Sequence, residues 1–131
     1  MEITAYVDFI KEQFQEIATD FGFIWEQQNE GTLLLKKKDL TILFATHYRE
    51  SGITISIRNL KKEEYFSLFD LAKKNGFETP FDCLSTDEKN INERYKGTIK
   101  YLIYSASIIL KKHFKELLEG DFSSVGKGHP L

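Results

Sequence analysis

Very short connections separate the segments of alternating apolar and polar side chains between residues 23 and 59. The alternating segments cover residues 23–28, 32–37, 40–49 and 53–59, and the connections are Asn29-Glu30-Gly31, Lys38-Asp39 and Glu50-Ser51-Gly52. Alternation with a period of two is typical of β-strands. A parallel neighbour would need a crossover of about a dozen residues or more, for which no chain is available. The sequence therefore predicts a four-stranded antiparallel meander.

Helical spacing of apolar residues is found on both sides of this meander. Residues 3–21 carry apolar side chains three or four positions apart, and Gly22 follows as a helix-terminating glycine. The same spacing predicts a helix over residues 61–75 and a longer helix over residues 91–119, with a loop over residues 77–90. The middle of the longer helix is apolar nearly all round, which indicates a helix that is covered on several sides.

The last alternating segment indicates which face of the sheet must pack against helices. One of its faces consists of isoleucines and is too apolar to face water, so helices must pack on it. The other face carries Thr54, Ser56 and Arg58 and is expected to be open. We therefore predict an α+β fold with an N-terminal helix, a four-stranded antiparallel meander and two C-terminal helices packed on one sheet face.

Length and composition fit a single domain over residues 1–131, in which residues 122–131 form a partly ordered tail. Cys83 is the single cysteine, which rules out an internal disulfide framework and is typical of a reducing compartment. The longest nearly apolar run, residues 101–110, is about half of the ~20 residues that span a bilayer. No signal peptide is recognised at the amino terminus. We therefore expect a soluble, cytoplasmic protein.

The stretch THYRESG, residues 46–52, contains the densest group of potentially reactive side chains. Strand alternation sends Tyr48 to one side and sends His47 and Arg49 to the other, so the group cannot act together on one substrate. A general base usually needs an orienting carboxylate, and Glu50 falls in the turn. We therefore predict no catalytic residue here. The predicted recognition surface on the open sheet face consists of His47, Arg49, Thr54, Ser56 and Arg58.

Patterns that bind metals or cofactors are missing from the sequence. His47, His113 and His129 are isolated from one another, and no pair of histidines or cysteines has metal-ligand spacing. No glycine-rich phosphate loop occurs. The acidic neighbours of Cys83 disfavour a reactive thiolate. We therefore predict no metal site and no cofactor.

Charge is distributed unevenly, although the net charge is only −2. Residues 1–22 hold five acids and one lysine, a balance of −4, and residues 76–90 hold four acids and one lysine, a balance of −3. Residues 91–131 hold seven bases and four acids, a balance of +3. Segregated charge steers association with a complementary protein. The predicted acidic binding surface consists of Glu12, Glu16, Asp20, Asp82, Asp87 and Glu88.

Two other functions stay open. Lys36, Lys37 and Lys38 form the one basic run, and together with Arg49 and Arg58 they would form a nucleic-acid surface. The small net charge and the lack of aromatic side chains interleaved on the same face argue against this alternative. The second alternative is a small-ligand-binding or enzymatic domain, which would need a pocket on the polar sheet face around His47 and Arg49.

Two segments of the sequence resemble segments of small bacterial immunity-type proteins from toxin–immunity systems. The first is DFGFIWEQ after an amphipathic helix, and the second is ASIILKKHFKELLEGDFSSV, which contains Gly120, Asp121, Phe122 and Ser123. The resemblance implies a toxin as the partner, protection by occlusion of the toxin, and no catalytic residues. The sequence therefore favours a non-enzymatic protein-binding domain, with the oligomeric state left open because an edge strand permits a dimer but does not require one.

Overall fold

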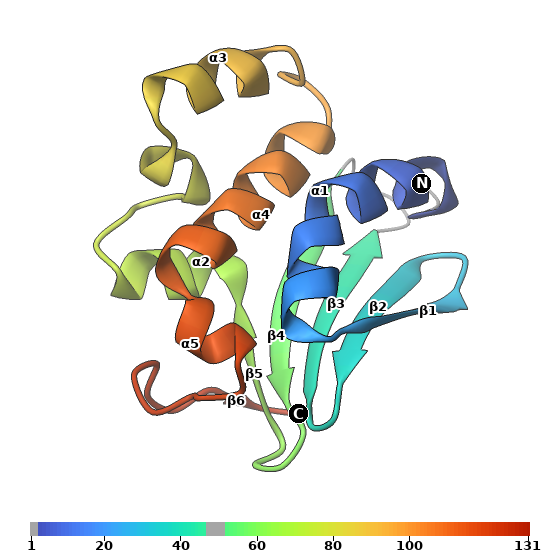
Figure 1. Ribbon diagram of the computed structural model, residues 1–131, viewed down its shortest axis with the longest axis vertical. Helices are drawn as coiled ribbons and strands as arrows, with labels where there is room; N and C mark the ends of the chain where they lie inside the picture. Colours follow the sequence, from blue (N-terminus) through green and yellow to red (C-terminus); the bar gives the residue numbers. More distant parts are fainter. Residues whose placement is uncertain (1–2, 47–51) are drawn as a thin grey trace.

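The computed structural model describes residues 3–46 and 52–131, which form helices and one antiparallel sheet (Figure 1). The α-helices among these residues are α1 (Val7–Phe21), α2 (Leu68–Lys74), α3 (Thr86–Glu93), α4 (Lys100–His113) and α5 (Lys115–Leu118). The strands are β1 (Ile24–Asn29), β2 (Thr32–Lys37), β3 (Leu40–Thr46), β4 (Ile53–Asn59), β5 (Glu64–Ser67) and β6 (His129–Pro130). Two short 3-10 helices, η1 (Ile3–Tyr6) and η2 (Pro80–Cys83), precede α1 and α3.

The strands lie in the sheet in the order of the sequence, from β1 to β6, and each is antiparallel to its neighbours. The cross-strand register aligns Leu34 of β2 with Leu43 of β3, and Leu43 with Ser56 of β4. The predicted α+β class and the antiparallel meander are therefore confirmed. The sheet has six strands among the described residues, where the sequence analysis gave four.

One face of the sheet packs against the helices and forms the core. Phe14 of α1 meets Phe44 of β3 edge to face, with 4.8 Å between the ring centroids. Burial of one such large apolar side chain contributes roughly 1.5–3 kcal/mol. The core-facing residues of the central strands alternate along each strand, as predicted for β4: Leu33, Leu35, Leu40, Ile42, Phe44, Ile53, Ile55 and Ile57. Helices α1 and α4 supply Ile10, Phe14, Ile17, Ile103 and Ile109 to the same cluster.

Helix α4 is covered on several sides, as its apolar composition predicts. It contacts α1 on one side and η2 and α3 on another. Ile103 and Ile109 point into the main core, whereas Ile108 is buried outside that core cluster, as is Leu84. In the contact with η2, the ring centroids of Tyr101 and Phe81 lie 4.3 Å apart. Helix α4 is therefore the central helix of the fold (Figure 1).

The helix predicted for residues 61–75 is wrong in its first half. Residues 64–67 form β5, which pairs with β4, and only residues 68–74 form helix α2. The side chain of Ser67 accepts a hydrogen bond from the backbone N–H of Asp70 at 3.1 Å and so caps the start of α2. Phe66 of β5 is buried in the core, whereas Phe69 of α2 is 43% exposed. At Phe66, pairing with β4 therefore outweighs the helical spacing of the apolar residues.

The long helix predicted for residues 91–119 is divided into several pieces, and the loop predicted for residues 77–90 contains η2 and most of α3. Gly97 has φ +87°, a left-handed conformation that ends the helical path between α3 and α4. Phe114 adopts φ −128° and ψ 32°, which separates α4 from α5. Helix α3 begins at a capping box: Ser85 Oγ accepts a hydrogen bond from the backbone N–H of Glu88, and Glu88 Oε1 accepts one from the backbone N–H of Ser85.

Residues 122–131, predicted as a partly ordered tail, run back to the sheet in the structure. Val125 is buried, and its carbonyl accepts a hydrogen bond from the ammonium group of Lys74. Strand β6 then pairs with β5, with His129 opposite Tyr65. At Gly128 a Cβ atom would lie 2.8 Å from the carbonyl oxygen of Tyr65, so only glycine permits this close approach.

Candidate functional site

The structure describes only three of the five residues of the predicted recognition surface. Thr54, Ser56 and Arg58 alternate with the core-facing isoleucines of β4 and therefore share the sheet face that points away from the helices. Ser56 is buried, and the other two are half-buried. His47 and Arg49 lie outside the described residues, so the small-ligand or enzymatic alternative that depends on them stays a prediction.

The outward sheet face is less polar at its centre than the sequence analysis predicted. Leu34 and Leu43 lie opposite each other on this face and are only 6% and 8% exposed. Lys36 and Glu26 lie on the same face beside them, with Lys36 Nζ 3.7 Å from Glu26 Oε2. An ion pair this exposed contributes little to stability. The face therefore has an apolar centre with charged side chains around it.

The basic run of residues 36–38 is split by the geometry of its strand. Lys36 lies on the outward face, whereas Lys37 lies on the helix side, where its Nζ donates a hydrogen bond to the backbone carbonyl of Leu118 at 2.6 Å. Desolvation by burial lowers the pKa of Lys37, although Glu119 acts in the opposite direction. Lys38 occupies the β2–β3 turn with φ +46°. The three lysines therefore do not form one continuous nucleic-acid surface.

The predicted acidic surface combines residues with different structural roles. Asp82 and Glu88 accept backbone hydrogen bonds in the capping boxes of η2 and α3. Glu88 also pairs with Lys112, and Glu16 pairs with the adjacent Lys111 at 3.4 Å. The pKa of Glu88 is lowered because these hydrogen bonds outweigh the opposing effect of desolvation. Within the described part of the chain, the remaining predicted residues, Glu12, Asp20 and Asp87, form no ion pair.

A groove of about 550 Å³ runs between α1 and the edge strand β1. Phe23, Trp25 and Ala18 supply its apolar lining, and Asp8, Lys11, Glu12, Gln15 and Thr19 supply its polar lining. The ammonium group of Lys11 lies 5.9 Å from the ring centroid of Trp25. Asp8 and Glu12 are four residues apart on α1 and therefore lie on the same side of the helix. Sequence reasoning did not find this groove, because it depends on the packing of α1 beside β1.

Strand β1 has β2 as its only neighbour among the described strands, so its other edge is free. Glu26 is its one charged residue, and the strand contains no proline and no lysine, the residues that usually block an edge. Its register is regular from Ile24 to Gln27 and shifts only between Gln27 and Asn29. Ile24 is 74% exposed at the start of the strand. A regular backbone edge therefore borders the groove.

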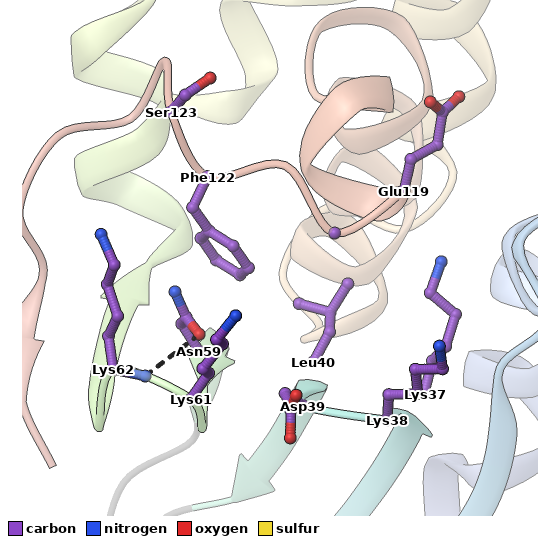
Figure 2. A pocket seen from close by; sticks show the side chains of 11 residues that line it. Lys37, Lys38, Asp39, Leu40, Asn59, Lys61, Lys62, Glu119, Phe122 and Ser123 are labelled. Carbon is purple, nitrogen blue, oxygen red and sulfur yellow. Dashed lines mark hydrogen bonds between the residues drawn. The ribbon is translucent and has the colours of Figure 1, made fainter.

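A second cavity, of about 450 Å³, lies at the end of the sheet where the β2–β3 and β4–β5 turns meet the end of α5 (Figure 2). We call it the lysine pocket, because its basic residues are Lys37, Lys38, Lys61 and Lys62. Asp39 and Glu119 are its acidic residues, and Phe122, Leu40 and Asn59 complete most of its wall. Sequence reasoning missed Lys61 and Lys62, although a meander places alternate turns at the same end of a sheet.

Cys83 is partly buried, and its thiol is held by a hydrogen bond. The thiol of Cys83 donates to the carbonyl of Pro80 at 3.0 Å, and burial raises its pKa. In residues 3–46 and 52–131, no three histidine, cysteine or carboxylate side chains are grouped so that they could hold a metal ion. No helix of the described chain has the length and apolar character needed to cross a membrane.

The chain was compared with protein families, curated proteins and solved structures. None of them matches it. Function is therefore inferred from the groove beside β1, which borders a free strand edge, and from the lysine pocket, which four lysines line.

Proposed function

We propose that this chain is a non-enzymatic protein-binding domain that captures an extended, basic segment of a partner protein along the free edge of β1. The observation that carries the proposal is the regular free edge of β1 beside the groove against α1. An extended peptide gains affinity from main-chain hydrogen bonds to such an edge, and it gains specificity from alternate side chains that enter a neighbouring groove.

The position of β1 supports strand addition rather than docking of a folded surface. Strand β1 is the outermost strand of the sheet and lies beside α1, which forms the opposite wall of the groove (Figure 1). A bound strand would continue the antiparallel sheet by one strand. Its side chains on the helix side would contact Trp25 and Phe23 on the apolar wall and Asp8 and Glu12 on the polar wall.

The charge of the groove supports a basic partner. Asp8 and Glu12 line the groove, and neither forms an ion pair with another described residue. Lys11, the one base in the lining, faces the ring of Trp25. A lysine or arginine at alternate positions of the bound strand would therefore meet unpaired carboxylates, and complementary charge of this kind increases association rates.

The resemblance to immunity-type proteins supports one form of this function. In that form the bound segment belongs to a toxin, and the chain neutralises the toxin by occluding it. A basic toxin such as a nuclease would present the required charge. The sequence phrases behind this resemblance lie in α1–β1 and in α4 and the residues after it, so they include part of the groove wall.

A peptide-display selection against the purified chain tests the binding mode. We expect selected peptides to carry lysine or arginine at alternate positions and to bind Glu12→Lys at least about tenfold more weakly than the original chain, because a repulsive charge replaces an attractive one. Glu78→Lys is the matched control, since Glu78 is also exposed but lies in the segment between α2 and η2. Peptides that bind the original chain and Glu12→Lys equally would contradict the proposal.

A protection assay tests the toxin form separately. The chain is co-expressed with each protein encoded beside its gene, and growth and co-purification are measured. Rescue of growth that is lost with Glu12→Lys and kept with Glu78→Lys is the expected result. If no neighbouring product is toxic or bound, the toxin form is wrong, while the peptide selection still decides whether β1 captures a strand.

A further inference from the structure

The lysine pocket is built from two hairpin turns and the chain that follows α5. Lys38 and Asp39 form the β2–β3 turn, and Lys61 and Lys62 lie in the β4–β5 turn. The backbone N–H of Leu60 donates to the carbonyl of Asp39 at 2.7 Å, so the two turns are joined directly. The backbone positions of Lys38, Lys61 and Lys62 are therefore set by two turns that are joined at the end of the sheet.

The charge inside the pocket is not balanced by the protein. Four lysines line the pocket with two carboxylates, Asp39 and Glu119. None of the four lysines forms an ion pair with a carboxylate of the described residues. In Figure 2, the carboxylates of Glu119 and Asp39 lie at the top and the bottom of the view, and the lysine side chains are spread around the pocket, with Lys62 on the left and Lys37 and Lys38 on the right. The lining therefore carries two more positive than negative charges, which favours the binding of an anion.

The rest of the wall offers an apolar surface and a directed polar group. The ring of Phe122 points down over the pocket, toward Asn59 and Leu40 (Figure 2). Phe122 is held by stacking on Phe66, with 5.9 Å between ring centroids and an interplanar angle of 23°. Asn59 is buried, and its Oδ1 accepts from the backbone N–H of Lys62 at 3.4 Å, which leaves its Nδ2 as a donor. The pocket therefore combines cationic donors with one aromatic wall.

We infer that the lysine pocket binds a phosphorylated small molecule that carries an apolar or planar part. The cavity volume of about 450 Å³ lies within the range of roughly 300–1,000 Å³ that is typical of small-molecule sites. Lysines bind phosphate as point charges, and a phosphate presents more charge and more acceptor oxygens than a carboxylate does. Phe122 would contact the apolar or planar part of the ligand.

This site is independent of the strand-capture surface. The groove beside β1 is lined by residues of α1 and β1, and the lysine pocket is lined by the β2–β3 and β4–β5 turns and the residues after α5. Variants of one site therefore leave the other intact. A bound phosphorylated molecule would also join the two turns to the chain around Phe122, because it would contact all three segments.

Amide chemical shifts of the ¹⁵N-labelled chain, titrated with inorganic pyrophosphate, AMP and adenosine, test the inference. We expect pyrophosphate and AMP to shift the amide signals of residues 37–39, 59–62 and 120–123. AMP should bind at least about tenfold more tightly than adenosine, because the phosphate supplies the charge that the lysines lack. Pyrophosphate without an aromatic part should leave the ring signals of Phe122 less affected than AMP does.

The double variant Lys38→Gln, Lys62→Gln should weaken AMP binding about tenfold or more, since it removes two cations from the pocket. Both side chains are exposed in turns, so the fold should be kept. The double variant Lys73→Gln, Lys127→Gln removes the same charge elsewhere and should stay within about twofold of the original affinity. The inference is overturned by equal affinities in the two double variants, by shifts located elsewhere, or by binding of an oligothymidylate but neither AMP nor pyrophosphate.

Discussion

The ammonium nitrogen of Lys37 donates a hydrogen bond across 2.6 Å to the carbonyl oxygen of Leu118, a residue 81 positions away in the chain. Leu118 is the last residue of α5, so its carbonyl has no partner inside the helix. The same ammonium nitrogen lies 5.9 Å from the ring centroid of Phe21 and 5.1 Å from that of Phe23. The end of β2 is thereby fastened to the end of α5.

The Lys37→Met variant should lose about 1–2 kcal/mol of unfolding free energy, because it leaves the Leu118 carbonyl without its donor while keeping a stem of similar length. Urea denaturation monitored by circular dichroism measures the loss. Lys38→Met is the matched control and should change stability by no more than about 0.5 kcal/mol, since Lys38 is exposed in the turn. Equal losses in the two variants would show that the hydrogen bond contributes nothing.

Asn92 of α3 is 1% exposed, and neither Oδ1 nor Nδ2 of its amide has a hydrogen-bond partner among the described residues. A buried amide without partners is destabilising. The Asn92→Leu variant has similar volume and no polar atoms, so it should raise the unfolding free energy by about 1 kcal/mol. Thermal and urea denaturation measure the change, with Asn92→Asp as the comparison that should destabilise. A loss of stability in Asn92→Leu would show that the amide is in fact satisfied.

Asp70 and His129 connect α2 to β6, with 3.1 Å between Asp70 Oδ2 and His129 Nε2. The hydrogen bond from His129, with help from Ser67, lowers the pKa of Asp70. A lowered carboxyl pKa stabilises the fold above the unfolded value of about 4, and this stability is lost as the pH falls through the folded pKa. Wild type should therefore be slightly more stable than Asp70→Asn at pH 6, and the difference should vanish in acid. Both side chains are well exposed, so the effect is small. A difference that is independent of pH in urea titrations would contradict this assignment.

Burial raises the pKa of the Cys83 thiol, which also donates to the carbonyl of Pro80. The thiolate fraction at neutral pH is therefore smaller than that of an exposed cysteine. Alkylation of the folded chain by iodoacetamide at pH 7.5 should be several-fold slower than alkylation in urea. Mass spectrometry of quenched samples gives both rates. Equal rates in the folded and unfolded chain would mean that the thiol is freely accessible.

The meander was predictable because its signals are local. The bounds of β2 and β4 match the alternating segments 32–37 and 53–59, and the short turns leave each strand a single choice of neighbour. Strand β5 was not predictable in the same way, since Tyr65 and Phe66 fit a helical spacing until β4 and β6 are present to pair with them. The sheet therefore overrides the local pattern there.

The division of the long helix had a partial signal in the sequence. Gly97 interrupts the helical pattern, and its positive φ ends the path between α3 and α4. Phe114, which separates α4 from α5, gives no comparable signal. Asp82 and Glu88 were interpreted as surface acids, yet the spacing of Thr79 to Asp82 and of Ser85 to Glu88 is that of capping boxes. Those two roles could have been found from the sequence alone.

The candidate sites depend on contacts between distant residues and were the least predictable part. The groove needs α1 beside β1, and the lysine pocket needs the chain after α5 to return over two hairpin turns. Only the acidity of α1 and the basic run beginning at Lys36 could be read from the sequence. Their division between opposite faces and separate cavities follows from the fold.

The central position of α4 affects the chain while it is being synthesised. Domains emerge from the ribosome with the N-terminal part first. The strands β2 to β4 and helix α1 therefore leave before Ile103 and Ile109, the side chains of α4 that complete their core. During that interval only α1 and α2 can cover the apolar face of the meander, and the free edge of β1 is exposed. We therefore expect the nascent chain to be most prone to aggregation before α4 has emerged.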